Sequence, residues 1–116
     1  MLTGHRDLRV WRDSMALVRL VYSVTKTFPS AEQFGLTSQM RRAAVSIPSN
    51  IAEGAARKSK REFAQFLSVA RGSLAEVETQ ILIAQDLNYL TEVDEVLDPI
   101  SGLMRSISGL MNTLEK

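Results

Sequence analysis

The chain has no cysteine, and its 116 residues include only one histidine, one tryptophan and three prolines. The lack of cysteine excludes disulfides, thiolate metal sites and thiol nucleophiles. The single histidine, His5, excludes the paired Glu-x-x-His motifs of di-iron or di-manganese bundles. Ser-His-Asp sets, zinc spacings and glycine-rich phosphate loops are missing as well. We therefore expect no catalytic residues, no metal and no cofactor, and predict that the protein is not an enzyme.

Long apolar segments are also missing. No run approaches the roughly 20 residues that cross a bilayer, and residues 1–7 lack the charged and then apolar build of a secretory signal. We expect a soluble, cytoplasmic protein with no membrane partner and no small-molecule substrate. The length favours one domain over residues 1–116, in which we expect residues 1–7 to be mobile.

Apolar residues recur at spacings of three and four in four segments, 8–27, 36–54, 59–88 and 91–114. No segment alternates like a strand and the connections are short, which predicts an all-α, antiparallel up-down-up-down four-helix bundle. Pro48 lies inside the second segment, so this helix either kinks there or breaks and restarts at Asn50. The unbroken apolar register favours the kink. The residues predicted to cap helix starts are Thr37 or Ser38, Ser59 with Glu62, and Thr91.

Two helices carry more apolar surface than a bundle core needs. We assign the core face of the first helix to Trp11, Met15, Val18 and Tyr22, and the remaining apolar residues widen its apolar arc to roughly half the circumference. The third helix adds two apolar residues outside its core line. A monomer would expose this surface, so we predict self-association. The predicted contact residues on these two helices are Val10, Leu17, Val21, Leu82 and Ile83.

The fourth helix carries small residues on the side opposite its core face. Gly102, Ser106 and Gly109 fall together there, although each glycine inside a helix costs about 1 kcal/mol relative to alanine. Either this smooth stripe lets a helix of another subunit approach closely, or the glycines are merely tolerated. We include all three residues in the predicted oligomer interface.

Charge is unevenly distributed along the chain. Residues 1–71 hold 12 Lys/Arg against 5 Asp/Glu, whereas residues 72–116 hold 2 against 8. Four cations, Arg57, Lys58, Lys60 and Arg61, occupy five positions between the second and third helices. Such clusters are typical of phosphate-backbone binding, and the alternative is a solvated loop or ion pairs with nearby glutamates. The full set of predicted nucleic-acid-binding residues is Arg41, Arg42, Arg57, Lys58, Lys60, Arg61 and Arg71.

The segment FGLTSQMRRAAVSIPSNIAEG at residues 34–54 closely resembles the signature of the four-helix-bundle proteins of intervening sequences in bacterial large-subunit ribosomal RNA genes. LRVW at 8–11 and EVET at 76–79 are similar to the same family. The resemblance implies a cytosolic bundle that assembles as a homopentamer and whose function is mostly unassigned. The accessory variability protein of diversity-generating retroelements, related in fold, implies a basic pentameric barrel that binds nucleic acid and a reverse transcriptase.

These patterns favour a non-catalytic, homo-oligomeric and pentameric adaptor that binds RNA, DNA or a nucleic-acid enzyme through its basic residues. The first alternative is a protein-interaction scaffold in which the arginines pair with glutamates across subunits. The second is an enzyme whose site lies between subunits.

Overall fold

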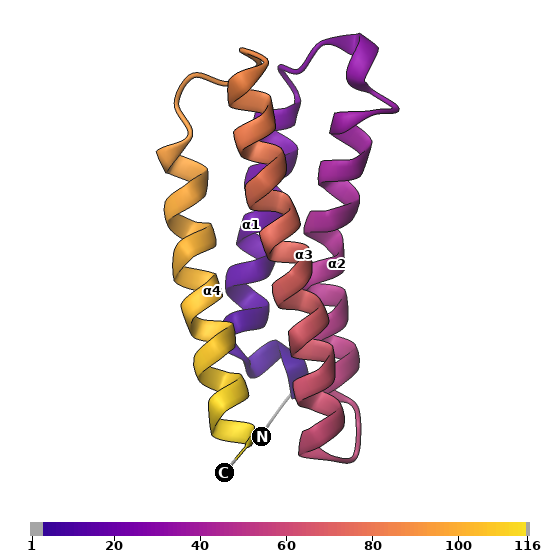
Figure 1. Cartoon of the computed structure of the whole chain (residues 1–116). Coiled ribbons are helices and arrows are strands. Elements are labelled where there is room, and N and C mark those ends of the chain that lie inside the picture. The colour runs from indigo at the N-terminus through magenta and orange to yellow at the C-terminus, as the bar shows by residue number, and fades with distance from the viewer. Residues whose placement is uncertain (1–3, 116) are drawn as a thin grey trace.

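Four long α-helices make up most of the chain in the computed structural model, which describes residues 4–115 (Figure 1). The helices are α1 at Arg9–Thr25, α2 at Leu36–Ala55, α3 at Lys60–Asp86 and α4 at Asp94–Leu114. Short 3-10 turns occur at Gly4–Asp7 and Ser30–Glu32. Residues 4–115 contain no strand, which confirms the predicted all-α class.

Consecutive helices lie side by side, and α1 and α4 complete the bundle by packing against each other. Figure 1 shows each helix running opposite to the one before it, so that the α2–α3 connection lies at the end where α1 begins and α4 ends. The contact between α2 and α3 is the most extensive and that between α1 and α4 the least. The molecule measures 44 × 23 × 21 Å. Its long axis separates the α2–α3 connection from the α1–α2 and α3–α4 connections at the other end (Figure 1).

The second helix continues through Pro48 as one element, so the alternative of a break and restart is wrong. Proline supplies no backbone N–H to the helix, and the two polar side chains that follow it donate hydrogen bonds to carbonyls of the preceding turn. The Ser49 hydroxyl donates to the carbonyl of Val45 at 2.9 Å, and the Asn50 amide donates to that of Ser46 at 2.8 Å. The kink itself stays a prediction.

Only one of the three predicted caps is present. The Ser59 hydroxyl accepts a hydrogen bond from the Glu62 backbone N–H at 3.1 Å and begins α3 as predicted. Neither Thr37 nor Ser38 caps α2, which begins at Leu36 with its backbone N–H bound to the Glu32 carboxylate at 3.1 Å. Thr91 does not cap α4 either, because that helix begins three residues later at Asp94 without a side-chain cap.

The core face of α1 differs from the predicted one. The buried residues of this helix are Val10, Ser14, Leu17, Val21 and Thr25, whereas the Trp11, Met15, Val18 and Tyr22 line is partly exposed. Two members of the buried line are hydroxyl residues that bind carbonyls of their own helix, Ser14 to Trp11 at 2.7 Å and Thr25 to Val21 at 2.8 Å. These internal bonds allow both side chains to be buried, but they make the line look less apolar in sequence than its neighbour.

Two other expectations concern the N-terminus and membranes. Residues 1–3 of the segment expected to be mobile lie outside the described residues, while Gly4–Asp7 forms a turn that contacts α1 and α2. The His5 ring lies 5.1 Å from that of Trp11. Within residues 4–115, none of the helices combines the length and the apolar character needed to cross a bilayer.

Candidate nucleic-acid interface

The corner between α2 and α3 is shaped by a close approach of the two helices. Gly54, in the last turn of α2, is buried, and a Cβ atom built on it would lie 2.6 Å from the Cβ of Phe66 and 3.0 Å from the Cδ1 of Phe63. Only glycine leaves room for α3 at this distance. The chain therefore reverses direction within a few residues, which concentrates the cations of 57–61 at one end of the bundle.

The four corner cations are used differently. Arg57 makes a 3.3 Å ion pair with Glu53, and its guanidinium lies 4.9 Å from the centre of the Phe66 ring. Lys58, Lys60 and Arg61 are exposed, and no carboxylate of residues 4–115 lies within ion-pair distance of them. The alternative in which local glutamates neutralise the cluster therefore applies to Arg57 alone within the described chain.

The position of the unpaired cations is unfavourable for the helix. Lys60 and Arg61 occupy the first turn of α3, where the helix dipole disfavours positive charge by roughly 0.3–1 kcal/mol for each residue. Among residues 4–115, no ion pair of Lys60 or Arg61 offsets this cost. Stabilisation of the isolated bundle therefore does not explain why these cations stand at this helix start.

Arg41 and Arg42 lie near the other end of α2. Arg41 is held against α1: its Nε donates to the Thr25 hydroxyl at 2.9 Å, and its guanidinium lies 4.5 Å from the centre of the Tyr22 ring. Arg42 is exposed and has no partner within residues 4–115. Together with Phe34 and Val45 they line an open hollow of about 720 Å³.

Arg71 does not extend the corner. Its guanidinium donates to the Ser108 hydroxyl of α4 at 3.2 Å, so it lies between α3 and α4, whereas Arg41 lies between α1 and α2. The seven predicted residues therefore form three separate groups. Two of these, the 57–61 corner and the Arg41–Arg42 pair, contain cations that have no partner in the described part of the chain and are therefore open to a ligand.

The predicted oligomer contact also needs correction. Val10, Leu17 and Val21 are at most 5% exposed in the single chain, so they are core residues and cannot form the contact. Leu82 and Ile83 are 43% and 42% exposed and remain available. The exposed apolar surface of α1 is instead its Trp11, Met15 and Val18 side, which forms a groove of about 340 Å³ with Val45, Pro48, Ser49 and Ala52 of α2.

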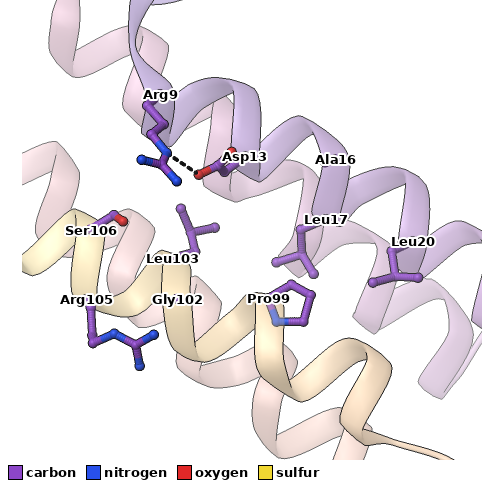
Figure 2. Close-up of a pocket in the computed structure, with 10 residues that line it drawn as sticks. All are labelled: Arg9, Asp13, Ala16, Leu17, Leu20, Pro99, Gly102, Leu103, Arg105 and Ser106. Atoms are coloured by element: carbon purple, nitrogen blue, oxygen red, sulfur yellow. Dashed lines mark ion pairs between the residues drawn. The ribbon is translucent and has the colours of Figure 1, made fainter.

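Two of the three small residues of α4 lie in a second groove, between α1 and α4 (Figure 2). Gly102 and Ser106 line this groove of about 540 Å³ and face α1 of the same chain. Leu17 and Leu103 point into it from opposite helices, and the 3.5 Å ion pair of Arg9 with Asp13 lies at one end. Gly109 is exposed, with nothing within 4 Å of a Cβ built on it, and its role as a contact stays a prediction.

The corner, the bundle and the segment 34–54 lie in a stretch that matches a known family. The model of the 23S rRNA-intervening sequence protein family covers residues 6–113. The chain belongs to this family. No curated protein matches it. Membership of the 23S rRNA-intervening sequence protein family agrees with the resemblance seen in the sequence, and it leaves the biochemical function open.

The structure of this 23S rRNA-intervening sequence protein family member adds two features that sequence reasoning missed. Phe34 is 90% exposed. In the turn before it, the Glu32 carboxylate accepts hydrogen bonds from the Leu36 backbone N–H at 3.1 Å and from the Tyr89 hydroxyl at 2.8 Å. These bonds lower the pKa of Glu32, and the bond to Glu32 together with burial raises the pKa of Tyr89. Glu32 and Tyr89 are 57 residues apart, so no local sequence pattern indicates the pair.

Proposed function

We propose that this protein is a non-catalytic, homo-oligomeric adaptor that binds nucleic acid through the corner between α2 and α3. The observation that carries the proposal is the set of Lys58, Lys60 and Arg61, three exposed cations that have no carboxylate partner within residues 4–115 and lie at a helix start, where positive charge is unfavourable. A phosphate backbone would supply the missing anions, and release of its counterions would make binding favourable.

Self-association is the second part of the proposal. The apolar α1–α2 groove and the exposed Leu82 and Ile83 of α3 are different surfaces of one chain. The charges near them are complementary: Arg19 is exposed next to Val18 on α1, whereas residues 72–116, which include Leu82 and Ile83, hold 2 Lys/Arg against 8 Asp/Glu. A head-to-tail contact of the groove with α3 of the next copy pairs opposite charges, and such contacts close into rings when the rotation permits. The family resemblance favours five copies.

The test compares two triple variants that lose the same charge. In the corner variant, Lys58, Lys60 and Arg61 are each changed to Gln. In the control variant, Arg12, Lys26 and Arg105 are each changed to Gln. Binding to duplex DNA is measured by gel shift over a salt series. Removal of three phosphate contacts should lower the slope of log affinity against log salt by about 2.7. We expect this in the corner variant and little change in the control.

Two results would contradict the nucleic-acid role. Equal losses in both triple variants would indicate unspecific attraction to the whole surface. An oligomer that shifts neither duplex DNA nor structured RNA at low salt would favour the protein-interaction scaffold. The corner variant should fold at least as well as the wild type, because it removes cations from a helix start, and its thermal midpoint checks this.

A further inference from the structure

Phe34 stands out among the exposed apolar residues because its ring is almost completely uncovered. It is 90% exposed, whereas the other large exposed apolar side chains lie between 39% and 54%. A phenyl ring in water forgoes the favourable free energy of burial. The ring therefore gains nothing for the isolated bundle from this position.

The backbone around Phe34 is fixed by hydrogen bonds. The backbone N–H groups of Gln33 and Gly35 donate to Ser30 and Glu32 carbonyls at 3.1 and 3.0 Å, and Glu32 links the turn to Leu36 and to Tyr89. A Cβ atom at position 35 would lie 2.7 Å from the Glu32 carboxylate, so a side chain there would require this carboxylate to shift. The turn presents Phe34 in one defined place, which reduces the entropy that a ligand contact would cost.

The hollow beside Phe34 has the charge of an anion site. Arg41 and Arg42 line it together with the Ser38 hydroxyl, and none of its lining residues is a carboxylate. Arg41 spends two donor contacts on Thr25 and Tyr22, which leaves other N–H groups of its guanidinium free. Arg42 has no partner in residues 4–115. Aromatic rings beside cations are the combination that binds unpaired nucleotides by base stacking and phosphate contact.

We propose that Phe34, with Arg41 and Arg42, forms a site for an unpaired nucleotide of a nucleic-acid strand, in which the base stacks on the phenyl ring and a neighbouring phosphate contacts the arginines. This inference rests on the proposed nucleic-acid function and deepens it. The 57–61 corner and the Phe34 site lie at opposite ends of the bundle (Figure 1), so each is tested separately. The corner binds backbone in any form, and the Phe34 site requires an exposed base.

The test measures binding of a labelled single-stranded oligouridylate, and of the same strand paired with its complement, by fluorescence anisotropy. Phe34→Ala should weaken binding of the single strand by about 5- to 150-fold, the range for loss of one stacked base, and leave duplex binding unchanged. Phe34→Tyr should bind normally, and Phe34→Leu should behave like Phe34→Ala. The control Leu87→Ala, an exposed apolar residue at the same end of the bundle, should have no effect.

A spectroscopic measurement separates stacking from simple apolar contact. In Phe34→Trp, the indole introduced at position 34 should lose fluorescence when single-stranded RNA is added, whereas the wild type, whose only indole is the half-buried Trp11, should not. Arg42→Gln should weaken single-strand binding and reduce its salt dependence by about one phosphate contact.

Three results would overturn the site. The first is wild-type affinity of Phe34→Ala or Phe34→Leu for the single strand. The second is a fall in the light-scattering mass of Phe34→Ala, which would make the ring a subunit contact. The third is a wild-type protein that binds duplex DNA but no single strand, which would leave the corner intact. Loss of all nucleic-acid binding would instead remove the proposed function and this site together.

Discussion

At the scale of single residues, the hydrogen bond between Glu32 and Tyr89 connects the turn before α2 to the segment after α3. The pKa of Glu32 is lowered from 4.5, so its contribution to stability is present above pH 4.5 and is lost as the pH falls through the lowered value. The pKa of Tyr89 is raised from 10.0, so its contribution is present below pH 10.0 and is lost as the pH rises through the raised value.

The variant Tyr89→Phe should therefore unfold at a lower temperature than the wild type between these limits, with the difference shrinking at both extremes. Thermal midpoints across the pH range measure this, and a carboxyl NMR titration should show the pKa of Glu32 moving back toward 4.5. The control Tyr22→Phe keeps the ring under Arg41 and should leave the pKa of Glu32 unchanged. A pH-independent difference would show that the bond contributes packing only.

At the scale of the elements, the glycine of the α2–α3 corner can be compared with a glycine in open space. Gly54→Ala should lower the free energy of unfolding by about 1–3 kcal/mol, because its Cβ would overlap Phe66. Gly109→Ala, with nothing within 4 Å, should raise it by up to about 1 kcal/mol through helix propensity. Urea unfolding measures both changes. A loss for Gly109→Ala would place that residue in a helix contact, the alternative left open by the sequence.

Helix number and helix type follow from the sequence because 3-4 periodicity is a property of each segment alone. The orientation of α1 does not follow, since half of its circumference is apolar and the buried line contains Ser14 and Thr25. The basic corner can also be predicted, because its four cations lie within five positions of the sequence. The separation of Arg41 from Arg71 is not, because it depends on which neighbouring helix each side chain meets. Local patterns thus predict elements and clusters, whereas tertiary pairings decide which residues stay free.

At the scale of the whole molecule, the proposed head-to-tail contact makes a prediction that a symmetric contact does not. Leu82→Glu with Ile83→Glu should disrupt one side of the contact, and Val18→Glu with Val45→Glu should disrupt the other. Each double variant alone should have the 12.9 kDa mass of one chain in light scattering. Both should stay helical in circular dichroism, because Leu82, Ile83 and Val45 are each more than 40% exposed and Val18 is only partly buried.

Mixing the two double variants decides between the two kinds of contact. Each retains one intact surface, so one groove and one α3 face remain compatible, and the mixture should form a complex of twice 12.9 kDa and nothing larger. A ring cannot close, because every further contact needs a disrupted surface. In a two-fold symmetric contact in which a surface meets its own copy, the variant that keeps this surface would associate with itself, and mixing the two variants would form no new complex. A control with Asn112→Glu, exposed on α4, should keep the wild-type mass. Wild-type mass in both double variants would exclude these surfaces and return attention to the α4 stripe.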